Sequence, residues 1–403
     1  MQNVFNTLER RGYVEQLTHP EEIKKLFEKE CVPFYIGIDP TADSLHVGHF
    51  ISLMVASHMQ KAGHKPIILM GGGTAIIGDP SGKTDMRKML TVEDIDNNVA
   101  QIKKQIEKFL SFEGPNAAII VNNGDWLRDL NYINFMREIG VHFSVNRMLA
   151  AECYKNRLET GLTFFELGYM LMQSYDFLYL HDHYGCKLEM GGNDQWSNII
   201  GGVELIRKIG AEDAYGFTFK LLTTKEGKKM GKTEKGALWL NPEKTSPYDF
   251  YQYWRNVADD DIENVMKLLT FIDVDEIEEM TKYKDERINE AKRRAAFEIT
   301  KLVHGEEAAI KAEEATKAMF EGKGNVEAME STKVEAGCTI TEALVNAGIA
   351  PSKGQAKTLI SQGAISLNDE KIDDIAYVLK EEDFKEGYAI LRKGKKIYHK
   401  LTK

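Results

Sequence analysis

Two histidines spaced three residues apart are of a type and spacing that suit phosphate chemistry. His46 and His49 stand in the segment DPTADSLHVGHF, where a helix is expected to begin near Val47. At that spacing both rings project from one face of the helix, and the free N–H groups at its N-terminus favour an anion. Gly48 between them leaves room for a flat base to approach the backbone. The alternative is a pair of histidines that only cap the helix.

A lysine-rich loop about 180 residues later could serve the same phosphates. It reads KKMGKT at residues 228–233 and is flanked by Gly227 and Gly236. Lysines on a mobile loop can close over a polyphosphate and neutralise the charge that develops on a leaving group. Taken alone, the segment is equally typical of a solvated lysine-rich turn.

A further pair of cations follows a glycine-rich strand end in GGGTAIIGDPSGKTDMR. Lys83 and Arg87 are four residues apart and could clamp phosphate oxygens. The segment lacks Walker A spacing, because Gly78 lies only four residues before Gly82. We therefore predict that the two cations are additional phosphate ligands.

Polar side chains interrupt the apolar segment FFELGYMLMQSYDFLYL at helical spacing. Tyr169, Gln173 and Asp176 occupy positions i, i+4 and i+7 and so share one face. A carboxylate and an amide are costly in such surroundings unless they find partners, which favours a binding pocket. Tyr35 ends the first predicted strand, and its hydroxyl could face the same pocket. A core helix with a tolerated polar edge is the alternative.

Alternating strands and helices must position these groups. Two segments, one near 163–182 and one reading QWSNIIGGVELIRKIG, are predicted to be helices. The predicted buried strands are CVPFYIGID, KPIILMGGG, AAIIVNNG and KLEMGG. This alternation predicts an α/β fold with a doubly wound parallel sheet, in which ligands bind beyond the carboxyl ends of the strands.

The pattern changes beyond the lysine-rich loop. The chain becomes mostly helical and charged from Pro247 to about Met319, and short elements return from about Cys338 after a polar stretch. The predicted segments are an α/β domain at 1–222, the lysine loop and a connection at 223–246, an α-helical domain at 247–325, a linker at 326–337 and a small α+β domain at 338–403.

Composition and charge are those of an ordinary globular protein. The 403 residues are 43% hydrophobic and 28% charged, without an apolar run that could span a bilayer or an evident signal peptide. We expect a cytoplasmic protein with reduced thiols at Cys31, Cys153, Cys186 and Cys338. The net charge of −10 argues against a nucleic-acid coat, yet the stretch from Arg392 to the end holds six Lys or Arg and no acid, as a local RNA contact would.

The two phosphate motifs, HVGH early in an α/β domain and KMGKT at its far end, together resemble the signatures of class I aminoacyl-tRNA synthetases. The combination in this order is far more specific than either motif alone. The resemblance implies a Rossmann-like catalytic domain whose two motifs act on ATP. The implied catalytic residues are Thr41, His46, His49, Lys83, Arg87, Lys229, Lys232 and Thr233. The implied ATP-binding residues are Asp39, Gly48, Asp194, Met230 and again Lys232.

The pocket residues resemble the tyrosyl branch of this family. Tyr35 and Asp176 would hydrogen-bond the phenol hydroxyl of tyrosine, and phenylalanine would leave both unpaired. Tyr169, Asp79 and Gln173 would hold the α-ammonium group. The segment GGNDQW would bring Asp194 to the ATP ribose and Gln195 to the reacting carboxylate. The implied tyrosine-binding residues are Tyr35, Gly37, Asp79, Tyr169, Gln173, Asp176 and Gln195.

Two positions depart from the family pattern. The lysine signature reads KMGKT rather than K-M-S-K-S, a glycine form that is familiar among bacterial members. Glu189 stands in KLEMGG where glutamine is expected beside the glycine pair. This second departure changes the charge expected around the substrate phenol.

The C-terminal segment resembles an S4-type RNA-binding domain, with SKGQAKTLISQGAISLN as its helix–loop–strand core. Its basic side chains would meet RNA phosphates. The implied RNA-binding residues are Lys353, Lys357, Arg392, Lys393, Lys395, Lys396 and Lys400. A solvated basic terminus is the alternative.

As a whole, the resemblance implies a two-step ligation. L-tyrosine and ATP would give tyrosyl-adenylate and pyrophosphate, and the tyrosyl group would pass to the 3′-terminal adenosine of tRNA(Tyr). ATP would be a substrate accompanied by Mg²⁺, without a prosthetic group, a metal site built by the protein, a membrane or DNA. A homodimer is expected, with tRNA spanning both subunits. The alternatives are a tryptophanyl enzyme of the same class, a non-catalytic RNA-binding paralogue and a small nucleotidyltransferase sharing the first motif.

Overall fold

The computed structural model describes residues 4–81, 90–210, 214–233, 236–320, 329, 331–335, 337–368, 370–384, 387–394 and 397–403. For residues 156, 232, 233 and 318–320 it describes the backbone alone. The chain folds into two compact units, residues 1–312 and 313–403. Across the described residues, no helix is long and apolar enough to cross a lipid bilayer.

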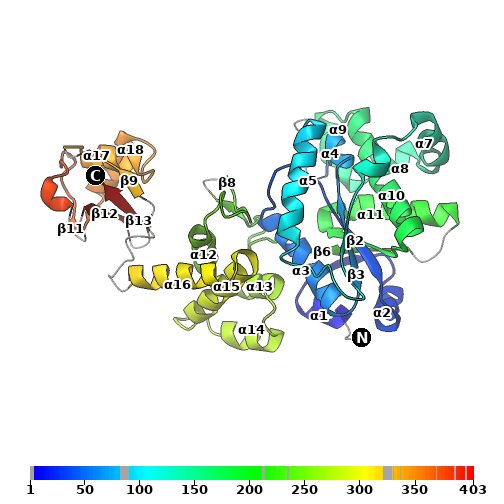
Figure 1. Ribbon diagram of the computed structural model, residues 1–403, viewed down its shortest axis with the longest axis horizontal. Coiled ribbons are helices and arrows are strands. Elements are labelled where there is room, and N and C mark those ends of the chain that lie inside the picture. The colour runs from blue at the N-terminus through cyan, green and yellow to red at the C-terminus, as the bar shows by residue number, and fades with distance from the viewer. Residues whose placement is uncertain are drawn as a thin grey trace. The chain divides into compact units, whose positions relative to one another are not determined.

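A mixed sheet forms the centre of the first unit (Figure 1). Within the described chain it has six strands in the order β1–β6–β5–β2–β3–β4. Their bounds are β1 Val14–Leu17, β2 Pro33–Ile38, β3 Lys65–Met70, β4 Ile119–Asn122, β5 Leu188–Gly192 and β6 Tyr215–Phe219. Neighbours from β6 to β4 are parallel, whereas β1 runs antiparallel to β6. The predicted parallel sheet is therefore confirmed, and β6 and the antiparallel β1 are additions to it.

Each central strand of the sheet faces two layers of helices. The helices are α3 Val47–Lys61, α5 Val92–Ile106, α10 Phe164–Tyr184 and α11 Trp196–Ile209. Successive side chains of a strand point to opposite sides, so Phe34 and Ile36 pack with α3 and α5 while Tyr35 packs with α10 and α11. Figure 1 shows the two layers on either side of the strands. Burial on both faces explains the continuous apolar runs in the sequence.

The strand order creates a crevice at one edge of the sheet. From β2 the chain moves outward to β3 and β4, and it then returns to the other side of β2 to form β5 and β6. The connections that leave β2 and β5 therefore diverge. In open α/β sheets, ligands bind outside the carboxyl ends of the strands at such a point.

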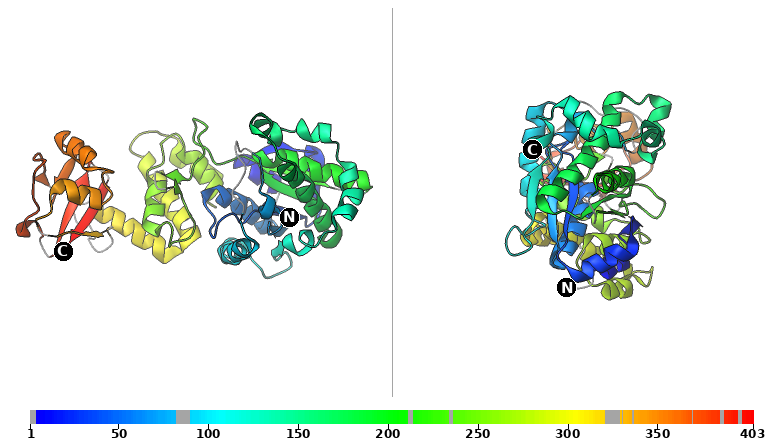
Figure 2. Two further views of the ribbon diagram at one scale, coloured as in Figure 1. Left: turned by 90° about the horizontal axis from the view of Figure 1, so that it is seen from above. Right: turned by 90° about the vertical axis from the view of Figure 1, so that its right-hand side faces the viewer.

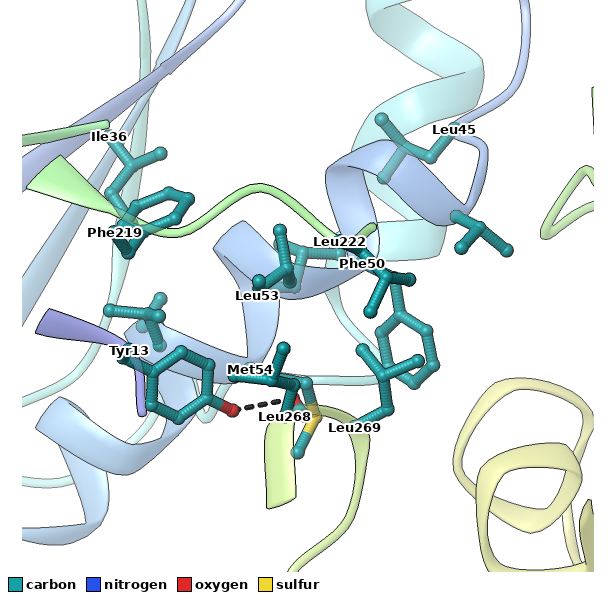
Figure 3. Close-up of a cluster of buried hydrophobic side chains, with 14 of the residues drawn as sticks. Tyr13, Ile36, Leu45, Phe50, Leu53, Met54, Phe219, Leu222, Leu268 and Leu269 are labelled. Atoms are coloured by element: carbon teal, nitrogen blue, oxygen red, sulfur yellow. Dashed lines mark hydrogen bonds between the residues drawn. The ribbon is translucent and has the colours of Figure 1, made fainter. Parts of the chain in front are cut away.

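The helical segment that follows the sheet shares its core. Its helices are α12 Pro247–Arg255, α13 Ile262–Leu269, α14 Val274–Thr281 and α15 Ile288–His304. Leu268 and Leu269 of α13 lie beside Leu53 and Met54 of α3 (Figure 3). The same figure shows the buried Tyr13 hydroxyl donating a 2.5 Å hydrogen bond to the carbonyl of Leu268. This packing fixes the helices against the sheet.

The remaining elements of the first unit are shorter. They are α1 Val4–Arg10, α2 Pro20–Lys29, α4 Thr74–Ile77, α6 Gly124–Leu127, α7 Tyr132–Glu138, η1 Gly140–His142, α8 Val145–Leu149, α9 Glu152–Thr160, η2 Asn193–Gln195, β7 Lys232–Thr233 and β8 Gly236–Ala237. The strands β7 and β8 pair as an antiparallel hairpin. This is the hairpin loop that the sequence predicts for the lysine-rich segment. Helix α16 Glu306–Phe320 crosses the boundary between the two units.

The second unit packs two helices against a small sheet (Figure 2). The helices are α17 Ile340–Asn346 and α18 Lys353–Ser361, and the strands are β9 Ser331–Lys333, β10 Ile365–Leu367, β11 Glu370–Lys371, β12 Tyr388–Lys393 and β13 Ile397–Thr402, with η3 Glu381–Asp383. The sheet order is β11–β10–β12–β13–β9. The strand β9 lies inside the segment 326–337 that the sequence predicts to be a linker. It belongs to the sheet because it pairs in parallel with β13.

Candidate active site

A cavity of about 390 Å³ opens at the carboxyl ends of the parallel strands. Its wall includes residues from β2, β5 and β6, from the start of α3 and from the lysine-rich loop. Residues predicted for catalysis or binding that line it are Tyr35, Gly37, Asp39, Thr41, His46, Gly48, His49, Asp79, Tyr169, Gln173, Asp176, Asp194, Gln195, Lys229 and Met230. Segments far apart in the sequence thus meet at the predicted edge of the sheet.

The two histidines form one end of this cavity. His46 is the N-cap of α3, and its Nδ1 accepts a 3.0 Å hydrogen bond from the N–H of Gly48. His49 Nδ1 accepts from the N–H of His46 at 3.3 Å, and the two rings stack with centroids 4.1 Å apart. A Cβ atom on Gly48 would lie 2.7 Å from the His46 ring. Glycine is therefore needed here for the histidine to cap the helix, and both rings remain at the cavity wall.

The lysine-rich hairpin packs directly on the histidine motif. The N–H of Val47 donates to the carbonyl of Leu238 at 3.0 Å, and the N–H of Leu238 donates to the carbonyl of Gly231 at 2.8 Å. Gly231 has φ +83°, and a Cβ on it would lie 2.8 Å from Cβ of Val47. The Tyr253 hydroxyl accepts from the N–H of Gly231 at 2.8 Å. Glycine at this position therefore suits both the positive φ and the close approach to Val47.

Lys229 places a cation at the mouth of the cavity. Its Nζ lies 4.0 Å from Oδ2 of Asp194, and both side chains are partly exposed. An exposed pair at this distance contributes little stability, so the ammonium group can move to another anion. The side chains of Lys232 and Thr233 lie outside the described residues, as do Lys83 and Arg87 altogether. The predicted roles of these four residues therefore stay predictions.

Asp176 forms the deep end of the cavity. Its side chain is 1% exposed. Asn123 Nδ2 donates to one carboxylate oxygen at 2.7 Å and Trp126 Nε1 donates to the other at 2.8 Å. Burial raises the pKa of Asp176 above its usual range, and the two donors oppose that rise. A carboxylate held in this way can accept a hydrogen bond from the hydroxyl group of a ligand.

Two further acids connect the strand ends to α10 and η2. Asp39 accepts hydrogen bonds from the hydroxyls of Tyr169 at 2.9 Å and Thr74 at 2.8 Å. Asp79 accepts from Gln195 Nε2 at 2.7 Å and from the N–H of Ser81 at 2.9 Å. These bonds place carboxylates beside the Tyr169 hydroxyl and the Gln195 amide, where a cationic group of a ligand would be stabilised.

Helix α10 is held in register by its own N-terminus. Thr163 caps the helix by accepting from the N–H of Glu166, whose carboxylate accepts from Thr163 in return. The buried guanidinium of Arg157 donates to Glu166 at 2.8 Å. The capping box and ion pair fix the first turn, and the polar face of the helix is directed from there into the cavity.

Sequence reasoning missed several residues of the site. Asn123 and Trp126 support Asp176, and Thr74 and Ser81 support the two other acids. Asn123 follows β4 directly, at the edge where ligands bind in such sheets. That position was the available signal for Asn123. The sequence holds no comparable signal for Trp126.

The second unit carries basic and aromatic side chains on one face of its sheet. Arg392 is paired across the strands with Tyr398, and Lys400 Nζ lies 4.9 Å from the ring centroid of Tyr388. The alternate residues of β12 and β13 form the core on the other face. Lys393 Nζ instead donates to the carbonyl of Ile349 at 3.2 Å.

The other predicted RNA-binding residues are placed less uniformly. Lys353 forms a 2.7 Å ion pair with Glu342, and Lys357 is exposed on α18. Lys395 and Lys396 lie outside the described residues. Among the residues that the structure does describe, no three His, Cys, Asp or Glu side chains gather as a metal site would require.

Comparison with known proteins gives a consistent family. Residues 28–321 match the model for tRNA synthetases class I (W and Y), and residues 321–401 match that for the tyrosine–tRNA ligase SYY-like C-terminal domain. A tyrosine–tRNA ligase of Caldanaerobacter subterraneus subsp. tengcongensis is 59% identical, with 99% of each chain covered. That of Acetivibrio thermocellus is 57% identical, covering 100% of this chain and 99% of its own.

Solved structures show the same fold over about four-fifths of the chain. The C-terminally truncated mitochondrial tyrosyl-tRNA synthetase of Aspergillus nidulans has a TM-score of 0.72 at 27% identity, covering 79% of this chain and 95% of its own. The truncated enzyme of Coccidioides posadasii has a TM-score of 0.67 at 30% identity, covering 78% and 92%.

Proposed function

The chain belongs to the tyrosine–tRNA ligases among the class I tRNA synthetases, and from this premise we propose how its residues divide the work. Such an enzyme uses ATP to activate tyrosine and then charges tRNA with it. The tyrosine carboxylate attacks the α-phosphorus of ATP, a new C–O–P link forms and the bond to pyrophosphate breaks. The reaction needs no nucleophile from the protein, so placement of the two substrates and stabilisation of charge supply the acceleration.

The observation that carries the assignment is the deep end of the cavity. Asp176 is buried with both oxygens held by N–H donors, and Tyr35 is buried beside it with a hydroxyl that has no hydrogen-bond partner among the described residues. A phenol hydroxyl placed between them can donate to Asp176 and accept from Tyr35. Phenylalanine would leave both groups unpaired, and such sites reject the analogue that lacks the hydroxyl strongly.

The α-ammonium group of tyrosine belongs among Asp79, Tyr169 and Gln173 in this proposal. Gly37 leaves open space at the end of its strand, because nothing lies within 4 Å of where its Cβ would be. Gln195, which is bonded to Asp79, then faces the reacting carboxylate. This arrangement points the carboxylate from the acidic end of the cavity toward the histidines.

We assign the nucleotide to the other end. His46, Lys229 and Lys232 match the charge that grows on the leaving pyrophosphate, and His49 with Gly48 borders the adenosine. Thr41 and Thr233 would donate hydrogen bonds, Lys83 and Arg87 would add cations, and Asp39, Asp194 and Met230 would border the ribose and base. Magnesium would accompany ATP and neutralise part of the charge on its phosphates.

The segments divide in the same way. We propose a catalytic domain at 1–222, the lysine loop at 223–246, a helical domain at 247–325 and an S4-like RNA-binding domain whose sheet includes β9 from the segment predicted to be a linker. The basic and aromatic face of the C-terminal sheet suits RNA, because arginine and lysine bind phosphates and tyrosine rings stack on bases. A cytoplasmic location follows from the tRNA substrate.

A homodimer is also part of the proposal. Large apolar side chains are exposed along the segments from α7 to the start of α10, with 68% exposure at Ile133 and 70% at Val141 and Phe164. Exposed apolar side chains that cluster in this way mark interaction surfaces. Sedimentation of an Ile133→Asp, Val141→Asp double variant should show monomers. A dimer of unchanged strength would place the interface elsewhere.

The test of the function is pyrophosphate exchange with each of the twenty amino acids. Tyrosine alone should support exchange, and Tyr35→Phe should narrow its advantage over phenylalanine. Better exchange with tryptophan would assign the pocket to the other member of the family. No exchange with any amino acid would favour a non-catalytic paralogue.

A further inference from the structure

Glu189 stands beside Tyr35 in the tyrosine pocket although it contacts no predicted ATP or tRNA group. The two residues are register partners on the parallel strands β5 and β2, so their side chains lie next to each other on one face of the sheet. Each is 1% exposed. Among the described residues, neither Tyr35 Oη nor Glu189 Oε2 makes a hydrogen bond of normal geometry, although the two groups are close enough to shift each other's pKa. Two such buried polar atoms side by side are costly unless a proton or a ligand joins them.

The surroundings of Glu189 favour its neutral form. Its Oε1 accepts from Gln173 Nε2 at 2.9 Å, and a Cβ on Gly202 of α11 would lie 3.0 Å from its Oε2. The titratable groups that face it are Tyr35, Asp176 and Cys186, and no lysine or arginine pairs with it in the described structure. Burial raises the pKa of Glu189 to about 7, although the neighbouring Tyr35 hydroxyl and Gln173 amide oppose that rise.

Glu189 and Asp176 compete for one proton. Two N–H donors stabilise the ionised form of Asp176 and a bound phenol adds a third donor, whereas Gln173 Nε2 and the Tyr35 hydroxyl act on Glu189. Hydrogen bonds to the charged form of a carboxyl favour ionisation. With tyrosine bound, the larger number of donors at Asp176 favours its ionised form and leaves the proton on Glu189, which lies beside Tyr35.

The number of protons at the phenol decides what Tyr35 can do. The hydroxyl of the substrate phenol has one hydrogen, with which it donates a hydrogen bond to Asp176. Tyr35 can therefore bind the phenol oxygen only by donating a hydrogen bond. Ionised Glu189 can only accept hydrogen bonds, so the Tyr35 hydroxyl would donate its hydrogen bond to Glu189 and not to the substrate. A carboxylic acid instead donates to Tyr35 Oη and leaves the Tyr35 hydrogen for the substrate.

We propose that Glu189 is a positioning residue for tyrosine recognition, which in its protonated form donates to Tyr35 and so turns the Tyr35 hydroxyl toward the substrate phenol. This inference rests on the proposed tyrosine pocket. It makes preference for tyrosine over phenylalanine depend on pH. Recognition is strongest while Glu189 keeps its proton and weakens as Glu189 ionises.

The test is KM for tyrosine and for phenylalanine in pyrophosphate exchange from pH 6 to 8.5, with the wild type and Glu189→Gln. The amide of glutamine donates to Tyr35 at every pH, and its oxygen still accepts from Gln173. Relative to this variant, the wild-type KM for tyrosine should rise by about 5- to 10-fold across the range, the usual size for one hydrogen bond. The KM for phenylalanine should show no such rise. Because every other titratable group is common to the two proteins, the ratio isolates Glu189.

Tyr35→Phe provides the matched control. Without the hydroxyl the pH-dependent rise should vanish, and adding Glu189→Gln should change the KM for tyrosine no further. A wild-type KM that follows the Glu189→Gln variant at every pH would overturn the proposal, as would a pH-dependent rise that survives in Tyr35→Phe. If Glu189→Gln fails to fold, the Tyr35→Phe profile against the wild type still decides. Absence of tyrosine-dependent exchange in the wild type would instead refute the proposed function.

Discussion

Replacing Gly231 by alanine tests whether the two signature motifs must touch for adenylate to form. Gly231 has φ +83°, where an L-residue costs roughly 1–2 kcal/mol. A new Cβ would also lie 2.8 Å from Cβ of Val47, which is fully buried in the first turn of α3. Val47 cannot retreat, so the hairpin must move away from the histidines. If the docked hairpin is required in the transition state, the backbone term alone slows the reaction roughly 5- to 30-fold.

The measurement is single-turnover formation of tyrosyl-adenylate, together with tyrosine binding followed by tryptophan fluorescence. Gly227→Ala is the matched control, because Gly227 has φ +80° in the same loop but nothing within 4 Å of its Cβ position. Gly231→Ala should be slower than Gly227→Ala by at least about tenfold, with tyrosine binding unchanged in both. Equal rates for the two variants would show that contact with Val47 is irrelevant, and a wild-type rate for Gly231→Ala would refute the docked hairpin altogether.

Three further outcomes follow from the site and the C-terminal unit. Lys229→Ala should slow adenylate formation roughly a hundredfold, the usual effect of one lost transition-state stabiliser, while tyrosine binding stays the same; unchanged activation would leave KMGKT a solvated turn. A chain ending at Phe320 should keep pyrophosphate exchange and lose tRNA charging, with a shallower salt dependence of tRNA binding, whereas equal charging by both chains would show that the C-terminal unit is not needed to bind tRNA. The wild type should lose up to about 3 kcal/mol of folding stability through Glu189 as the pH rises from about 4.5 to about 7, because a carboxyl whose pKa is raised in the folded state favours that state only while it is protonated. Glu189→Gln should not show this loss. Melting curves of both proteins that shift equally with pH would contradict this last expectation.

The fold was predictable where pattern and burial agree. β2 and β3 are continuous apolar runs buried on both faces, and the sequence predicts them directly. β1 and β9 were not predictable, because VEQL and STK are short, polar and largely unburied. Their strand conformation is imposed by pairing with β6 and β13, partners about 200 and 70 residues away in the sequence.

The site was predictable where the chemistry of single residues is unusual for its surroundings. Asp176 in an apolar helix indicates a pocket from the sequence alone, because a buried carboxylate needs partners. Trp126 gives no such indication, because an indole is common in a protein core and the sequence does not show which acceptor its N–H contacts. The contact between Gly231 and Val47 could not be predicted either, because the spacing of residues along the sequence does not show which backbones approach each other in the fold.

In the proposed binding mode, the charges of the cavity favour one orientation of its two substrates. Asp79 follows α4 and Asp176 lies on α10, whereas the stacked histidines and Lys229 lie at the start of α3 and in the lysine-rich loop. An ammonium group is stabilised at the acidic end and the ATP phosphates at the other. Tyrosine reversed in the cavity would put its carboxylate among acids and its phenol beside Lys229 and the histidines, and would lose both sets of interactions. With the phenol at Asp176, the carboxylate is the only part of tyrosine left to face the α-phosphorus, so recognition of the side chain also aims the nucleophile.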